Sequence, residues 1–259
     1  MRPLSFAIVV GLAAGLVYAQ EDSPPETVST FSILGYDPQT GEVGGAVQSR
    51  VFSVGNGVLW AEAHVGAVAT QAMVDVSYGP KALALLEQGL DLEEIVRRIH
   101  DEDPDPWPDV WPKTGRQFAV MNARGEHAVF TGDAAPEWAG HAASRHATAQ
   151  GNLLASPDVV AEMIRAFEET DGHLSLRLVA ALEAGQAAGG DRRGMQSAAI
   201  LIVKEDGGGW LNNDVVMRLQ VDDHAEPIRE LGRLVDLALE ANRRMDALRE
   251  SLNSAPLPR

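Results

Sequence analysis

The sequence contains no cysteine. Disulfide bonds, thiolate metal centres and a cysteine nucleophile are therefore excluded. Basic residues are scarce as well. Only 21 Lys and Arg stand against 37 Asp and Glu, and no run of them forms the basic patch that a nucleic-acid binder needs. The formal net charge of −16 favours solubility and would attract a cationic substrate. We expect no nucleic-acid partner.

Several catalytic motifs are missing too. The chain has no H-E-x-x-H, which weighs against a zinc hydrolase, and no G-x-S-x-G, which weighs against an α/β-hydrolase. Its glycines lack the spacing of phosphate-binding or dinucleotide-binding loops. Asp222, Asp223 and His224 have ligand types that suit a divalent cation. Adjacent strand residues point to opposite faces, so capping of the next helix is the favoured interpretation, and we expect no metal and no cofactor.

The N-terminus has the pattern of a secretory signal peptide. Arg2 precedes an apolar run over residues 6–17, and a small-residue cleavage pattern ends at Ala19. We expect a signal peptide over residues 1–19 and a short leader over residues 20–29, hence a secreted or periplasmic protein. The apolar run is short for a bilayer span, and no later segment is long enough for one. No membrane association is therefore expected after cleavage.

Strand and helix patterns follow one another in blocks along the rest of the chain. The predicted strands cover residues 31–37, 42–49, 58–62, 64–70, 116–122, 127–131, 196–204 and 215–221, and the predicted helices cover residues 80–89, 91–103, 157–170, 174–184 and 227–252. Strands paired in hairpins, rather than alternating with helices, argue against a doubly wound parallel sheet. We predict one α+β domain over residues 30–252, with two antiparallel sheets between helices, and a tail over residues 253–259.

Two segments lack a simple pattern. Residues 104–112 contain four prolines and two tryptophans, which excludes regular helix or sheet and indicates an ordered loop. Residues 138–155 have the composition of one strand and a loop.

The segments "TFSILGYDPQTGEVGGAVQSR", "RQFAVMNARGEHAVFTG" and "GGDRRGMQSAAILIV" occur in the same order as in a known family. Together with "YGPKALALL" and "VDDHAEPIREL", they resemble the domain of unknown function 1028 family (DUF1028) from residue 30 to about residue 237. That family resembles a branch of the N-terminal-nucleophile (Ntn) hydrolases. The resemblance implies a four-layer αββα sandwich and an amidase-like activity.

In the Ntn hydrolases, the first residue of the chain supplies both nucleophile and base, and the resemblance assigns this role to Thr30. A threonine hydroxyl is a weak nucleophile and needs an adjacent base. An α-amine with a pKa of about 8 lies on the same residue. Here the predicted signal cleavage leaves Gln20 first, so the Ser29–Thr30 bond must be cut again. In an uncut chain Thr30 is simply a β-branched strand residue.

Three further candidates lie near the ends of the first strands. Arg50 follows the second strand, where a cation would lower the pKa of the nucleophile and stabilise an oxyanion; the alternative is a surface ion pair. Gln71 has the chemistry to orient a substrate carbonyl, and Asp75 to hold a substrate amine. Structural hydrogen bonding explains Gln71 equally well.

Two polar loops complete the candidate site. Asn152 ends the segment "QGN", and Asp191, Arg193 and Gln196 belong to the segment "GGDRRGMQS". Glycines let backbone N–H groups approach a ligand, and the polar side chains suit substrate binding or an oxyanion hole. An Asp–Arg pair that only stiffens the turn is the alternative.

The sequence therefore predicts a secreted hydrolase that cleaves an amide bond in a small molecule or peptide. A non-catalytic binding protein on the same scaffold is the main alternative, because a fold does not fix function. A metal-dependent hydrolase built on Asp222, Asp223 and His224 is a weaker third option. Two roles stay open for the C-terminal helix: covering the sheet, and pairing subunits in a homo-oligomer.

Overall fold

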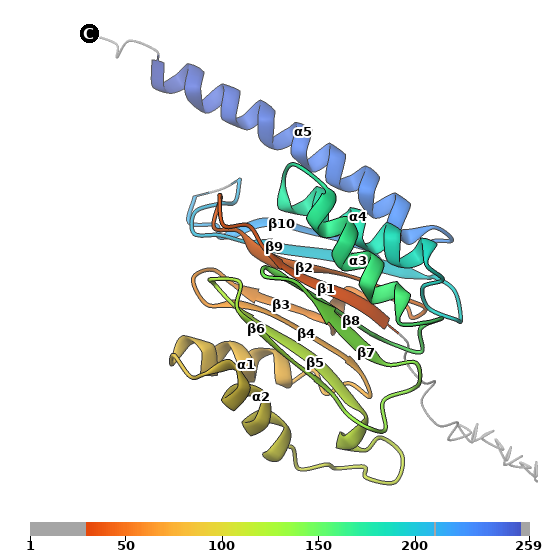
Figure 1. The fold of residues 1–259 in the computed structure, drawn as a ribbon. Coiled ribbons are helices and arrows are strands. Elements are labelled where there is room, and N and C mark those ends of the chain that lie inside the picture. The colour runs from red at the N-terminus through yellow and green to blue at the C-terminus, as the bar shows by residue number, and fades with distance from the viewer. Residues whose placement is uncertain (1–29, 210, 255–259) are drawn as a thin grey trace, which may run out of the picture.

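The computed structural model describes residues 30–209 and 211–254. It contains two antiparallel sheets that lie face to face (Figure 1). The larger sheet has the order β10 (Val215–Val221), β9 (Ser197–Val203), β2 (Val43–Ser49), β1 (Thr30–Tyr36), β8 (Ala147–Asn152) and β7 (Gly140–Ala143). The smaller sheet has the order β3 (Leu59–Glu62), β4 (Gly66–Ala72), β5 (Arg116–Asn122) and β6 (His127–Thr131).

Helices cover the outer face of each sheet, which gives four layers in the order αββα (Figure 1). The smaller sheet carries α1 (Tyr78–Glu87) and α2 (Leu92–Asp101), and the larger sheet carries α3 (Asp158–Glu169), α4 (Leu174–Ala187) and α5 (Pro227–Ser254). Two short 3-10 turns, η1 (Val54–Asn56) and η2 (Lys113–Gly115), lie in connections. The predicted α+β sandwich of two antiparallel sheets between helices is confirmed.

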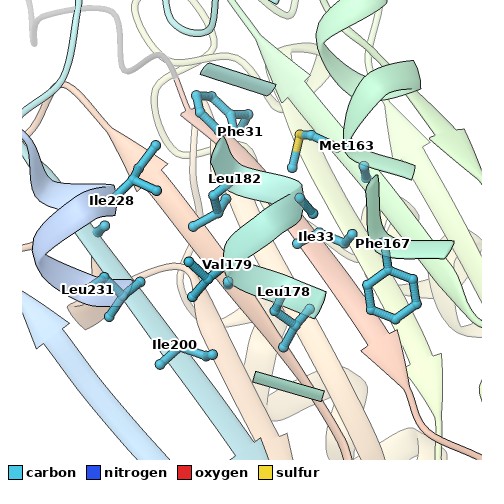
Figure 2. Packing of buried hydrophobic residues seen from close by; sticks show 14 of the residues in the cluster. Phe31, Ile33, Met163, Phe167, Leu178, Val179, Leu182, Ile200, Ile228 and Leu231 are labelled. Carbon is cyan, nitrogen blue, oxygen red and sulfur yellow. The ribbon is translucent and has the colours of Figure 1, made fainter. Parts of the chain in front are cut away.

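The core between the helices and the larger sheet follows from the alternation of side chains along β1. Phe31 and Ile33 point to the helix side, where they pack with Met163, Phe167 and Leu178 (Figure 2). All five are fully buried. Amphipathic helices need such an apolar surface, because most of their stability comes from tertiary packing.

A second core lies between the two sheets and is built from smaller residues. Leu34, Val47 and Leu201 of the larger sheet meet Ala69 and Met121 of the smaller one. Within the larger sheet the strands also approach closely. A Cβ atom added to Gly44 would lie 2.1 Å from the carbonyl oxygen of Leu201, so only glycine fits at this point of β2.

Residues 138–155 differ from the prediction, because they form two strands rather than one. The second of them, β8, pairs along nearly the whole of β1 and lies between β1 and the edge strand β7. Its small residues Ala147, Ala149 and Gly151 obscured the strand pattern in the sequence, since they are weak strand formers.

Some predictions fall on residues that the structure does not describe. The expected signal peptide and leader, residues 1–29, lie outside the described ranges, as do residues 255–259 of the expected tail. Over residues 30–209 and 211–254, no helix combines the length and the apolar character that a bilayer crossing requires.

Candidate functional site

Thr30 is the first residue of β1 and lies at one end of the sandwich. Its neighbours across the ladder are Ser49 on β2 and Asn152 on β8. The Thr30 hydroxyl donates to the Ser49 hydroxyl oxygen at 3.1 Å, and both residues are fully buried. Because Phe31 points to the helices, the alternation along β1 turns Thr30 toward the smaller sheet. The hydroxyl therefore lies between the sheets.

Five polar side chains surround the start of β1, and we call them the inter-sheet amide cluster: Ser32, Gln71, Gln117, Gln150 and Asn152. None of them is more than 1% exposed. They come from β1, β4, β5 and β8, and hence from both sheets. Burial of so many amides requires that they hydrogen-bond to one another, because an unpaired buried amide is costly.

Gln71 connects the two sheets within this cluster. Its Oε1 accepts a hydrogen bond from the Ser32 hydroxyl at 2.5 Å, and its Nε2 donates to Gln117 Oε1 at 2.8 Å. The same Nε2 lies 3.4 Å from the carbonyl oxygen of Thr30 and 3.3 Å from that of Gln150. Two amide hydrogens thus serve three acceptors. The sequence predicts that Gln71 orients a substrate carbonyl; in the structure its side-chain amide contacts the backbone carbonyl of Thr30.

Gln117 and Asn152 extend the cluster along β5 and β8. Gln117 Nε2 donates to the Gly151 carbonyl at 2.9 Å and to the Thr131 hydroxyl at 3.0 Å. Asn152 Nδ2 lies 3.3 Å from Gln117 Oε1 and 3.5 Å from the Thr30 carbonyl oxygen. The side-chain amides of Gln71 on β4 and Asn152 on β8 therefore both contact the carbonyl oxygen of Thr30.

The sequence prediction missed Ser32, Ser49, Gln117 and Gln150. For Ser32 and Gln150 a usable signal was present, because polar side chains alternate with apolar or small ones at the start of β1 and along β8. A period of two places one set on a single face of the sheet. Register is the second signal, since the hairpin turn that pairs Tyr36 with Val43 also pairs Thr30 with Ser49.

Arg50, Asp191 and Arg193 form a separate group beside the end of β2. Asp191 is 2% exposed and forms an ion pair with Arg193 at 3.0 Å. Its carboxylate also accepts from the backbone N–H of Arg50 at 3.2 Å. The Arg50 guanidinium donates to the Arg193 carbonyl at 2.6 Å. This group fixes the turn that follows Ser49. The Thr30 hydroxyl itself hydrogen-bonds to Ser49.

The remaining two predicted residues lie outside the inter-sheet amide cluster. The backbone N–H of Gln196 donates to the Ser49 carbonyl at 3.0 Å, while its side-chain amide donates to Asp223 at 3.1 Å. Asp75 accepts from the backbone N–H of Ser77 at 2.9 Å and so belongs to the turn before α1. Gln196 thus borders the site through its backbone.

The three residues that precede α5 and were considered as metal ligands, Asp222, Asp223 and His224, each hydrogen-bond to a different partner. Asp222 accepts from Ser53, Asp223 from Gln196, and His224 Nδ1 accepts from the backbone N–H of Glu226 at 3.0 Å. Among residues 30–209 and 211–254, no group of three or more His, Asp or Glu side chains is arranged to hold a metal ion.

A buried ion pair anchors the proline-rich loop at the same end of the smaller sheet. Arg116 directly precedes Gln117 and pairs with Asp103 at 3.1 Å, and the hydroxyl of Tyr78 donates to Asp103 at 2.6 Å. Burial, followed by the hydrogen bond to Asp103, raises the pKa of Tyr78 far above its ordinary value.

The Asp103 carboxyl has the opposite shift. Burial by itself raises its pKa, but the hydrogen bonds from Tyr78 and from the backbone of Asp105 outweigh burial, with further help from the charge of Arg116. The net pKa of Asp103 lies below its ordinary value, so this carboxyl stays ionised in the folded protein.

Comparison with known proteins agrees with this architecture. The model of a family of unknown function, DUF1028, matches residues 30–231. The chain belongs to the DUF1028 family. A crystal structure of a DUF1028 protein from Silicibacter pomeroyi is similar, with 31% sequence identity and a TM-score of 0.72 over 81% of this chain and 89% of that one. No curated protein matches the sequence. The family match begins at Thr30, the first residue of β1.

Proposed function

We propose that this DUF1028 protein is an amide hydrolase of the N-terminal-nucleophile type, in which Thr30 becomes the first residue of the mature chain. The observation that carries the proposal is the position of Thr30. It begins both β1 and the family match, and its hydroxyl and carbonyl lie among buried hydrogen-bonding side chains from both sheets. A strand residue with a merely structural role needs no such surroundings.

The chemistry requires the Ser29–Thr30 bond to be cut first, by the protein itself or by another protease. The freed α-amine then takes the proton from the Thr30 hydroxyl, and Oγ1 attacks the substrate carbonyl. Collapse of the tetrahedral intermediate breaks the C–N bond, and the leaving amine receives the proton. Water then attacks the ester on Oγ1, the same α-amine acting as base, and releases the carboxylic acid.

The inter-sheet amide cluster has a positioning role in this proposal. Gln71 and Asn152 hold the Thr30 carbonyl, which restricts the orientation of the attacking residue. Ser49 accepts the hydrogen bond from the Thr30 hydroxyl. Arg50, Asp191 and Arg193 supply charge at the neighbouring turn, while Asp75 and Gln196 remain candidates for contacts with the rest of the substrate.

The test is a comparison of Thr30 variants in the protein recovered from its own secretion route. A panel of acyl and aminoacyl p-nitroanilides serves as the probe. We expect the wild-type protein to start at Thr30, Thr30→Ser to keep part of the activity, and Thr30→Ala to lose it. Activity that survives Thr30→Ala would overturn the proposal.

A non-catalytic binding protein is the second candidate. It is favoured by the hydrogen bond that holds the Arg50 guanidinium on the Arg193 carbonyl, because a cation committed to a structural contact is less available to stabilise an oxyanion. A chain that keeps residues 20–29 and binds an amide compound without cleaving it would support this candidate.

A further inference from the structure

A cavity lies at the end of the sandwich opposite Thr30. It has a volume of about 440 Å³, which is within the range of small-molecule sites. Its wall includes Glu42, which directly precedes β2, whereas Thr30 pairs with Ser49 at the other end of that strand. Seven residues of extended strand separate the two ends by about 20 Å. This cavity is therefore independent of the proposed active site.

Four segments that are distant in sequence form the cavity, and one of them is the end of the β1–β2 turn, which carries Glu42. The glycine-rich β9–β10 turn contributes Gly207, Gly208 and Gly209, α4 contributes Leu176, and α5 contributes a longer stretch. The β9–β10 turn lies beneath α5 in Figure 1. The apolar part of the wall consists of Leu176, Val216, Leu239 and Met245. This composition suits an aliphatic group.

The polar part of the wall contains the buried carboxylate of Glu42, which lacks a full set of hydrogen-bond donors among the described residues. Glu42 is 6% exposed, and its Oε2 has no hydrogen-bond partner among the described residues. Its Oε1 lies 3.4 Å from His173 Nε2, which is too long for a strong hydrogen bond. The terminal torsion of a glutamate is broad, so either oxygen can turn toward the cavity. A buried carboxylate in this state favours a donor from outside the chain.

The His173 ring faces Glu42 with its Nε2. Its Nδ1 accepts a hydrogen bond from the backbone N–H of Ser175 at 3.1 Å, which caps the start of α4. The Ser175 hydroxyl lies 2.8 Å from the same Nδ1, so this side of the ring is engaged at the start of α4. Arg243 also lines the cavity, but no ion pair joins it to Glu42 in the part of the chain that the structure describes.

We propose that this cavity binds a primary ammonium group carried on a short aliphatic chain. The ammonium group donates to the Glu42 carboxylate, and the aliphatic chain packs against Leu176, Val216 and Leu239. A free amine and an amino acid share this chemistry. They differ in whether a carboxylate is present for Arg243, which lies at the exposed side of the wall. The negative net charge of the protein favours the approach of a cation.

The test is titration calorimetry of the full mature protein with isoamylamine, L-leucine and 4-methylvalerate. We expect the two ammonium compounds to bind and 4-methylvalerate not to bind. Glu42→Gln should weaken binding at least about tenfold, since a hydrogen bond to a charged group is lost. The matched control is Glu205→Gln. Glu205 is exposed, lies near the β9–β10 turn and forms an ion pair with His64. This control should leave the affinity unchanged.

Two further variants keep the test decisive if Glu42→Gln fails to fold. Leu239→Trp fills the apolar part of the cavity from a partly exposed position on α5 and should abolish binding. Arg243→Gln separates the two sources, because it should weaken leucine and not isoamylamine if the ligand is an amino acid. No binding of either ammonium compound at about 10 mM, or affinity unaffected by Glu42→Gln and Leu239→Trp, overturns the proposal.

Discussion

Replacement of Gln71 by leucine tests whether direct hydrogen bonds hold the two sheets together at the Thr30 end. The substitution keeps a similar volume but removes every hydrogen bond of the amide. Ser32 then loses the only acceptor that its hydroxyl has among the described residues. The Thr30 carbonyl and Gln117 Oε1 each keep a contact with Asn152. One stranded buried donor costs about 1–3 kcal/mol and each lost hydrogen bond about 1 kcal/mol more.

The hydrogen bonds donated by both hydrogens of the Gln71 amide are lost in addition to the stranded Ser32 donor, so we expect Gln71→Leu to lower the free energy of unfolding by about 3–5 kcal/mol. Urea unfolding followed by tryptophan fluorescence measures this difference. Gln88→Leu is the matched control, because Gln88 is exposed and its side-chain amide donates to the carbonyl of Ala84 in the adjoining helix α1. A loss below about 0.5 kcal/mol for Gln71→Leu, equal to an ordinary surface substitution, would refute the reasoning.

Gln71→Glu adds a pH dependence with a definite sign. A carboxylate has no donor for the carbonyl oxygens of Thr30 and Gln150, whereas the protonated acid has one. Burial raises the folded-state pKa of the new carboxyl above its unfolded value of about 4.3. Relative to wild type, this variant should lose stability as the pH rises from about 4.3 through the folded-state pKa. Gln71→Leu should show no such trend.

The other predictions concern the buried ion pair and the tight point of β2. Asp103→Asn leaves the guanidinium of Arg116 without its carboxylate and should cost about 3 kcal/mol in urea unfolding, since removal of one buried partner strands the other. Because the folded-state pKa of Asp103 is lowered, its contribution to the free energy of unfolding is present above the unfolded pKa of about 4 and is lost as the pH falls further. The difference in stability between wild type and Asp103→Asn should therefore narrow at low pH. A difference that stays constant would contradict the lowered pKa. Gly44→Ala should cost about 2 kcal/mol or more in thermal unfolding because its Cβ would meet the Leu201 carbonyl. Gly209→Ala should be nearly neutral, because a Cβ added there has no atom of the described residues within 4 Å apart from its chain neighbours.

The layer architecture was predictable because the patterns that determine it are local. Hairpin turns, alternation along strands and helix ends all lie within a few residues of one another. The start of α2 is an example, since the side chain of Asp91, the first residue of the helix predicted over 91–103, accepts from the backbone N–H groups of Glu93 and Glu94. The resemblance to DUF1028 added the order of the layers.

The partners of Thr30 were harder to predict, because they come from four strands of two sheets. Gln71 was found as a polar residue near the end of a predicted strand, and Asn152 through the polar segment "QGN". Gln117 was missed because nothing local distinguishes it from an exposed strand residue. Only the pairing of β4 with β5 and the stacking of the sheets bring it to within 2.8 Å of the Gln71 amide. Long-range pairing of this kind has no signature in a single sequence.

The most direct test of the account is the N-terminal residue of the mature protein. Intact mass and N-terminal sequencing of protein from its native secretion route would be measured first. The account predicts a chain that begins at Thr30, with a free α-amine. A stable chain that begins at Gln20, with no species starting at Thr30, would remove the base from the mechanism and contradict the proposed hydrolase.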